Sequence, residues 1–280
     1  MTAASAPVLL AIDIGNTNVT LGTFVYDGSV AALGEHWRLA TPRGQTSDEV
    51  GVLLRALFEQ AGIETRRVAG VIVSSVVPPL LPIWERVCTK LFDREPLVVG
   101  PGIRTGMPVR YENPHEVGAD RIVNAVAAYE WMGGPVIAVD FGTATTFDCV
   151  SERGEYLGGA IFPGVLVAME ALFERAAMLR RVELSPPRSV IGKTTAQAVQ
   201  SGMLYGYAGM VDAMVERIRG ELGEAARVIA TGGLAGRIAG ESRSIERVEP
   251  FPTLEGLRMI FERNRTLRGD PPPRKERERT

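Results

Sequence analysis

The chain has 280 residues, of which 45% are hydrophobic and 23% are charged, as expected of a folded protein with one or two domains. The formal net charge of -2 argues against non-specific nucleic-acid binding, which a basic face would support. No apolar run approaches the about 18 residues of a membrane span, and the N-terminus lacks the basic segment of a secretory signal. We therefore expect a cytoplasmic protein with no membrane or nucleic-acid partner.

The first predicted elements are two strands joined by a polar turn, in the segment LLAIDIGNTNVTLGTF (residues 9–24). Asp13 ends a fully apolar run, where a carboxylate is costly unless it is paired or binds a cation. Gly15 lets the backbone approach a ligand, and the side chains of Thr17 and Asn18 can donate hydrogen bonds. The alternative for this turn alone is an ordinary β-hairpin, because Asp, Gly, Asn and Thr are common in turns.

Strands then alternate with helices, which predicts an α/β fold with partly parallel pairing. Thr46 and Glu49 form a capping-box pattern at the start of one of these helices, and Gly62 follows its end. The predicted elements are a strand at 35–39, a helix at 48–60, a strand at 68–73, a helix from 78 to about 91 and a short strand at 97–99.

Residues 100–120 are rich in Gly, Pro, Arg and Asn, so we expect a long irregular connection, and such loops are often functional. The segment ends in NPHEVGADR (residues 113–121) at the start of a helix predicted from about 119 to 131. Arg121 can bind a substrate carboxylate while Asp120 accepts a proton from a nearby hydroxyl. The alternative is that Asp120 only caps the helix.

Residues 136–150, VIAVDFGTATTFDCV, repeat the pattern of the first hairpin. Asp140 again ends an apolar run, and Gly142 and three threonines follow it. The repeat favours a chain of two duplicated domains. We expect the two turns to face each other across a cleft and to hold a polyphosphate and its Mg²⁺, because Mg²⁺ takes one or two carboxylates plus phosphate oxygens.

The second half also contains a helix at 165–176 with one apolar face, which indicates core or a subunit interface. Gly202, Gly206 and Gly209 in the helix predicted at 195–219 suggest close packing against a neighbour. The strand at 227–230 leads into TGGLAG (residues 231–236), a turn suited to a nearby nucleotide. GKTT at 192–195 resembles the end of a P-loop, but it lacks the upstream Gly at the required spacing, so the sequence does not predict a P-loop here.

The order of the motifs along the chain resembles that of the type III pantothenate kinase family, which belongs to the actin-like ATPase and sugar-kinase superfamily. The motifs are, in order, DxGNTN, NPxxVGADR, DFGTATT, GGAIFPG, GKTT, TGGLAG and LEGLRMIFERN. The resemblance covers about residues 9–264. It implies an α/β fold of two duplicated ribonuclease H-like (actin-like ATPase) domains with a central interdomain cleft. The domains would be 1–118, with the first phosphate motif, and 119–268, with the second phosphate and adenosine motifs, followed by a disordered tail at 269–280.

The resemblance also implies roles for individual residues. Asp120 would be the general base that activates the primary hydroxyl of pantothenate, Asp13 would bind Mg²⁺, and Asp140 would lie near a monovalent cation, K⁺ or NH₄⁺. The residues implied to bind ATP are Asp13, Gly15, Asn16, Thr17, Asn18, Gly142, Thr143, Thr145, Gly232 and Gly233. Those implied to bind pantothenate are Tyr111, Gly118, Ala119 and Arg121, with Thr194 and Thr195 from the partner subunit of a homodimer.

The implied activity is ATP-dependent phosphorylation of pantothenate to 4'-phosphopantothenate, the first step of coenzyme A biosynthesis. Two alternatives remain open at this point. One is a catalytically altered homologue that acts as an accessory transcriptional regulator. The other is a different actin-like small-molecule kinase, acting on a sugar or acetate.

Overall fold

The computed structural model describes residues 6–27, 30–42, 44–176 and 179–267. These residues fall into two compact units. The first comprises Met1–Gly106, His115–Ala127 and Thr253–Thr280, and the second comprises Met107–Pro114 and Ala128–Pro252. The domain boundaries expected from the sequence follow the repeated motifs and stay a prediction. The contact units differ from these boundaries in three places, since residues 107–114 belong to the second unit, and residues 119–127 and 253–267 to the first. The predicted tail lies outside the described residues.

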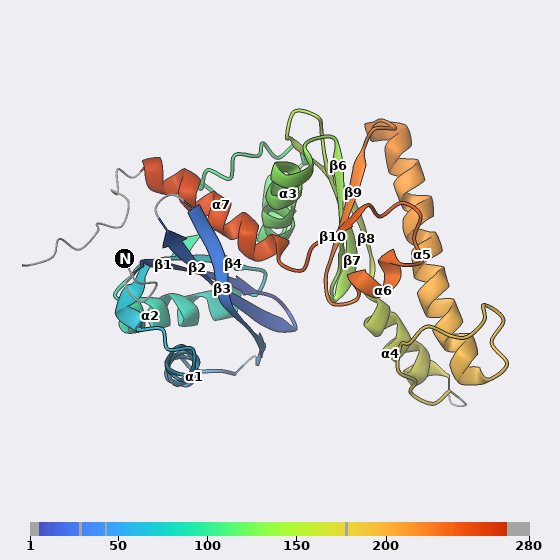
Figure 1. The fold of residues 1–280 in the computed structure, drawn as a ribbon, viewed down its shortest axis with the longest axis horizontal. Helices are drawn as coiled ribbons and strands as arrows, with labels where there is room; N and C mark the ends of the chain where they lie inside the picture. Colours follow the sequence, from blue (N-terminus) through green and yellow to red (C-terminus); the bar gives the residue numbers. More distant parts are fainter. Residues whose placement is uncertain (1–5, 28–29, 43, 177–178, 268–280) are drawn as a thin grey trace, which may run out of the picture. The chain divides into compact units, whose positions relative to one another are not determined.

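The first unit is built on a five-stranded mixed sheet of order β3-β2-β1-β4-β5 (Figure 1). Strands β1, β2 and β3 are antiparallel, while β4 pairs parallel to β1, and β5 pairs parallel to β4. β1 has mostly buried residues along its whole length, as expected of a central strand with covered faces. The strands are β1 Val8–Ile14, β2 Asn18–Asp27, β3 Val30–Ala40, β4 Val68–Ser75 and β5 Leu97–Val98.

Helices cover both faces of this sheet. Helices α1 (Ser47–Gln60) and α2 (Leu81–Phe92) pack on one face with Leu10, Phe58 and Trp84 in the core. On the other face, α7 (Pro252–Leu267) brings Leu254 against Gly22 and Phe261 against Gly70, where any larger residue would clash. The predicted capping box is confirmed, since Thr46 and Glu49 each accept a backbone hydrogen bond from the other. Short turns of 3₁₀ helix are η2 Thr65–Arg67, η3 Pro78–Leu80 and η4 Pro114–Glu116.

The second unit repeats this topology in a sheet of order β10-β9-β6-β7-β8. Again an antiparallel three-stranded meander, β6 to β8, is extended by a parallel strand beside its first member, here β9. The shared order confirms the duplication predicted from the two hairpin motifs. The elements of this unit are β6 Val136–Phe141, β7 Ala144–Val150, β8 Tyr156–Pro163, β9 Arg227–Thr231 and β10 Arg247–Val248, with α4 Val165–Arg175, α5 Thr195–Leu222 and α6 Ala235–Ala239. Helix α3 (Ala119–Met132) begins in the first unit, to which its residues up to Ala127 belong, and ends in the second.

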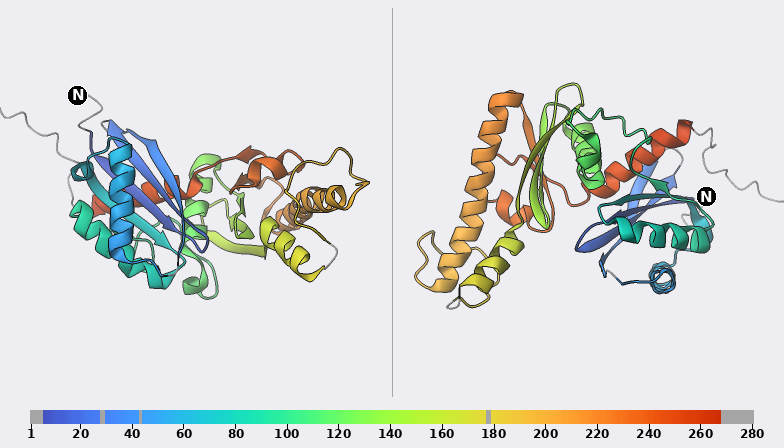
Figure 2. Two further views of the ribbon diagram at one scale, coloured as in Figure 1. Left: turned by 90° about the horizontal axis from the view of Figure 1, so that it is seen from below. Right: turned by 180° about the vertical axis from the view of Figure 1, so that it is seen from behind.

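Helices α4, α5 and α6 cover one face of the second sheet, and Figure 2 shows α4 beside the long α5. The core between them includes Val139, Phe147 and Val211. The prediction that the α5 glycines pack closely against a neighbour is wrong for this chain. Gly202, Gly206 and Gly209 are exposed, and a Cβ atom on any of them would meet nothing within 4 Å in the described part of the chain.

Within the described ranges, no helix is long and apolar enough to cross a membrane.

Candidate functional site

Asp13, near the end of β1, lies beside Ser74 on the parallel strand β4. The Ser74 hydroxyl donates a hydrogen bond of 2.6 Å to Asp13 Oδ1. Burial raises the pKa of Asp13 to about 7; the Ser74 hydrogen bond lowers it, and the negative charge of Asp120 raises it further. The first unit therefore holds two nearby carboxylates in a poorly solvated place, and this donor chemistry suits a divalent cation.

The turn after Asp13 is held by backbone and hydroxyl hydrogen bonds. The amide of Gly15 donates to the carbonyl of Asn18 over 3.0 Å, and the Thr41 hydroxyl donates to the carbonyl of Gly15 over 2.8 Å. A Cβ atom on Gly15 would lie 2.9 Å from the Asn18 oxygen, so the turn excludes larger residues. The side chains of Asn16 and Thr17 are exposed.

Asp120 is the second residue of α3, inside the first turn, so it does not occupy the N-cap position. Its Oδ1 accepts a hydrogen bond of 2.8 Å from the amide of Arg121. A Cβ atom on Gly118 would lie 2.6 Å from the same oxygen, so glycine leaves room for the carboxylate to fold back. Burial raises the pKa of Asp120, while the Arg121 amide and guanidinium lower it. A carboxylate with a raised pKa is a stronger base when ionised.

In the second unit, the turn after β6 is joined by the glycine turn after β9. Asp140 pairs with Thr146 on β7 and with Thr231 on β9. Gly232 has a φ of 95°, and a Cβ atom there would lie 2.6 Å from Asp140 Oδ1. The backbone after β9 therefore lies directly against the second acidic strand end, and only glycine allows this approach.

The threonines that follow Asp140 point in different directions. The carbonyl of Thr143 accepts a hydrogen bond of 3.1 Å from the amide of Gly164, which fixes the turn. Thr145 is fully buried on the core face with Phe147, and its hydroxyl is the one buried side-chain atom found without a hydrogen-bond partner among the described residues. Thr146 is paired directly with Asp140 across β6 and β7, so these two side chains lie on the same face of the sheet. Because side chains alternate along a strand, this is the face opposite to that of Thr145.

The predicted substrate residues occur in three places. Tyr111 lies in the second unit, where its ring would be 3.2 Å from a Cβ atom on Gly158. Gly118, Ala119 and Arg121 surround Asp120 at the start of α3 in the first unit. The Thr194 hydroxyl accepts a hydrogen bond of 3.2 Å from the Gln197 amide and so caps α5, with Thr195 exposed beside it.

Sequence reasoning missed several supporting residues. Ser74 and Thr41 hold the first turn, and the only signal for Ser74 is a polar residue that follows an apolar strand. In the second unit, Asp148 and Tyr156 are both fully buried and hydrogen-bonded to each other. An acid inside the apolar run of β7 could have indicated Asp148.

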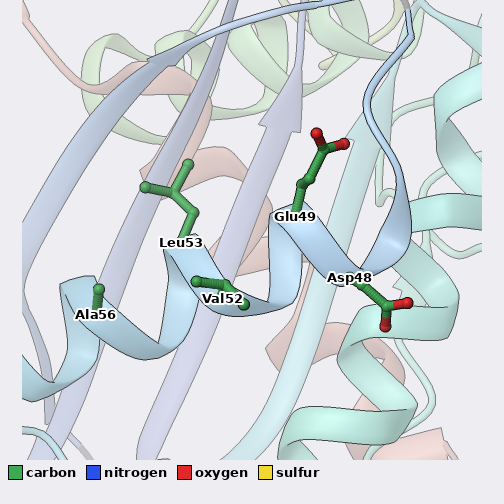
Figure 3. Close-up of a pocket in the computed structure, with 5 residues that line it drawn as sticks. All are labelled: Asp48, Glu49, Val52, Leu53 and Ala56. Atoms are coloured by element: carbon green, nitrogen blue, oxygen red, sulfur yellow. The ribbon is translucent and has the colours of Figure 1, made fainter.

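A depression on α1 lies apart from these residues (Figure 3). It is lined by side chains of this one helix, among them Val52 and Leu53, and by none of the predicted site residues. Among the residues that the structure describes, no group of three or more His, Cys, Asp or Glu side chains could hold a metal ion.

The duplicated sheets and their acidic hairpin turns define the class as an actin-like ATPase or sugar-kinase fold. Two solved structures support this class. A putative Baf family transcriptional activator from Campylobacter jejuni matches with a TM-score of 0.58 at 17% identity, over 92% of this chain and 99% of that one. A putative 2-dehydro-3-deoxygalactonokinase from Sinorhizobium meliloti matches with a TM-score of 0.55 at 14% identity, over 97% and 99%. At these identities the likeness concerns the fold alone.

The sequence comparisons are more specific. The model of the family described as type III pantothenate kinase matches residues 9–217. Type III pantothenate kinases from Anaeromyxobacter sp. (strain K) and Moorella thermoacetica are 57% and 54% identical over 258 and 257 residues, covering 92% of this chain and 100% of each relative. The chain belongs to the type III pantothenate kinase family and is a phosphotransferase. Kinases of this kind use ATP together with a divalent metal.

Proposed function

We propose that Asp120 is the general base with which this kinase phosphorylates pantothenate. The activity of the family is ATP-dependent phosphorylation of pantothenate to 4'-phosphopantothenate, the first step of coenzyme A biosynthesis. The observation that carries the assignment is the pair of nearby carboxylates in the first unit, Asp13 beside Ser74 and Asp120 at the start of α3. Two acids of different surroundings can divide the work, one binding a cation and one accepting a proton.

Asp13 would hold Mg²⁺, and the first turn would contact the ATP phosphates through Gly15, Asn16, Thr17 and Asn18. Mg²⁺, when bound, compensates charge on the phosphates as the phosphoryl group is transferred. The Asp13 carboxylate fits this role because burial and the charge of Asp120 raise its pKa, so a bound cation would stabilise its ionised form. The Ser74 hydroxyl would hold the carboxylate in one orientation.

The second motif would also contact ATP, through Gly142 and Thr143. Thr145, which was expected to join them, has a fully buried side chain and would support this turn from the core face instead. Gly232 and Gly233 would approach adenosine, and the positive φ of Gly232 supports a close backbone contact. Asp140 would lie near a K⁺ or NH₄⁺ ion. The relative placement of the two hairpins expected from the sequence stays a prediction.

Asp120 would take the proton of the primary hydroxyl while Arg121 binds the carboxylate of pantothenate. Arg121 is suited to this because its guanidinium presents a planar pair of donors, which matches a carboxylate. Tyr111, Gly118 and Ala119 would complete the contacts. We also infer a cytoplasmic enzyme, because its co-substrate ATP is supplied there.

We further propose a homodimer in which Thr194 and Thr195 reach the partner's substrate. Apolar side chains on β8, on α4 and before α5 support it, since Ile161 is 65% exposed, Leu166 55% and Ile191 79%. The exposed glycines of α5 would allow another helix to approach closely. Light scattering should show a dimer that Leu166→Glu converts to monomer. Val52→Glu, at a more exposed site on α1, should remain dimeric.

The roles are tested by assaying purified protein with pantothenate, ATP and Mg²⁺, with and without K⁺ or NH₄⁺. The Asp120→Asn variant should lose about 10²- to 10⁴-fold in kcat, because general-base catalysis contributes on that order. Thermal unfolding should show that the variant is folded. An unchanged rate would show that Asp120 is not the general base. Turnover that does not depend on K⁺ or NH₄⁺ would contradict the proposed monovalent cation near Asp140.

A further inference from the structure

A buried carboxylate and a buried phenol form a pair in the second unit. Asp148 on β7 and Tyr156 at the start of β8 both have 0% exposure. The Tyr156 hydroxyl donates a hydrogen bond of 2.8 Å to Asp148 Oδ1, and the Thr146 hydroxyl lies 3.3 Å from Oδ2. An acid inside a strand core is costly unless hydrogen-bonded, so the orientation of Tyr156 is strongly constrained by this contact.

The backbone of Tyr156 in turn holds the segment that precedes Tyr111. The Tyr156 amide donates to the carbonyl of Pro108, and the Arg110 amide donates to the carbonyl of Tyr156, both over 2.8 Å. These bonds form an isolated parallel bridge between Val109 and Tyr156. The Arg110 guanidinium also pairs with Glu155 over 2.6 Å. The segment is thus attached to the sheet through the backbone of Tyr156 and the side chain of Glu155.

Tyr111 follows this bridge directly. Its ring lies over Gly158, two residues beyond Tyr156, where a Cβ atom would be 3.2 Å from the ring. Gly158 has a φ of 120°, so both its conformation and its lack of a side chain suit this contact. The place of the Tyr111 ring is therefore set by the Tyr156 bridge on one side and by Gly158 on the other.

We infer that Asp148 is a positioning residue for the substrate, because it fixes Tyr156 and through it the segment that carries Tyr111. This inference rests on the proposed contact between Tyr111 and pantothenate. Neither Asp148 nor Tyr156 contacts the reacting atoms in this scheme. Their role is to reduce the freedom of Tyr111 before substrate binds, which affects substrate affinity more than the phosphoryl-transfer step.

Tyr156→Phe tests this by removing only the hydroxyl. The KM for pantothenate should rise about three- to tenfold, as expected for one lost hydrogen bond, while kcat and the KM for ATP stay within about twofold. The matched control is Tyr129→Phe. Its hydroxyl donates to the carbonyl of Glu152 over 3.2 Å in the same unit but has no place in the chain of contacts to Tyr111, so all three constants should be unchanged.

Asp148 provides a second route if Tyr156→Phe folds poorly. Asp148→Asn keeps an oxygen that can accept the Tyr156 hydrogen bond, so its KM for pantothenate should stay close to that of the parent enzyme. Asp148→Ala removes the acceptor and should raise that KM at least as much as Tyr156→Phe. Equal effects of the two Asp148 variants would overturn the inference.

A double-mutant cycle separates this inference from the proposed site. If Tyr156 acts through Tyr111, adding Tyr156→Phe to Tyr111→Ala should leave the pantothenate KM of Tyr111→Ala unchanged. Additive effects would mean that Tyr156 acts elsewhere, while the proposed role of Tyr111 would stand. If Tyr111→Ala alone leaves this KM unchanged, both the proposed contact and the inference fail. A loss shared equally by kcat and both KM values would indicate a general structural defect and also overturn the inference.

Discussion

The two acidic hairpins have the same framework but different surroundings. Asp13 and Asp140 occupy equivalent strand positions, and the parallel neighbouring strand presents a hydroxyl residue to each, Ser74 on β4 and Thr231 on β9. The first acid lies near a second carboxylate, Asp120, whereas the second lies against the glycine turn at Gly232. The duplication kept the strand register, and the segment that packs next to each acid gave each hairpin its own chemistry.

The difference in charge around the first hairpin can be tested through pH. The pKa of Asp13 is raised from its usual range to about 7 by burial, so the folded state holds this proton more tightly than the unfolded state. Its contribution to stability is full below about pH 4 and is lost as the pH rises through about 7. Without ATP or metal, Asp13→Asn should be more stable than the parent protein at pH 8 by a few kcal/mol, and equally stable near pH 4.

Urea unfolding at the two pH values measures this difference, with turnover assayed in parallel. The same variant should be nearly inactive, because an amide is a poor ligand for Mg²⁺. If Asp13→Asn is less stable than the parent at pH 8, the carboxylate is stabilised in the folded state and the comparison with the second hairpin loses its basis.

The close approach at the second hairpin predicts sensitivity to one methyl group. Gly232→Ala would place a Cβ atom 2.5 Å from the carbonyl of Phe141, at a φ of 95° that alanine rarely adopts. We expect a loss of about 2 kcal/mol in stability and a raised KM for ATP. In Gly236→Ala, in α6 just after the same turn, the new Cβ atom meets nothing within 4 Å among the residues that the structure describes, so this variant should be neutral or slightly stabilising. Similar melting temperatures for both variants would contradict this interpretation.

The smallest expected effect concerns Asp212, a carboxylate whose pKa is lowered, whereas that of Asp13 is raised. Burial raises the pKa of Asp212 on α5, but hydrogen bonds from Ser242, Arg243 and Ser244 outweigh it and leave the pKa lowered. Stability from this group is present above the unfolded-state pKa and lost as the pH falls through the folded-state value. Asp212→Asn should cost about 1 kcal/mol at pH 7 after allowance for solvent screening, and nothing near pH 2. Guanidinium unfolding at both pH values measures this difference in stability. A loss of stability that persists near pH 2 would contradict the interpretation.

Local pattern was sufficient for much of the fold. Apolar runs that end in an acid predicted both hairpins, and the Thr46 and Glu49 pattern predicted the start of α1. These features depend on residues within a few positions of one another. The start of α3 at Ala119, and hence the place of Asp120 in its first turn, followed from the same kind of signal.

The sequence by itself determined the two acidic turns, the adjacent Asp120 and Arg121, and the family to which the chain belongs. Only the tertiary structure decided that Ser74 holds Asp13, that α7 completes the first unit, and that Asp148 and Tyr156 support the segment before Tyr111. These contacts join residues on different strands and helices. Local propensity does not encode them, because they form only when strand register and helix packing bring distant side chains together.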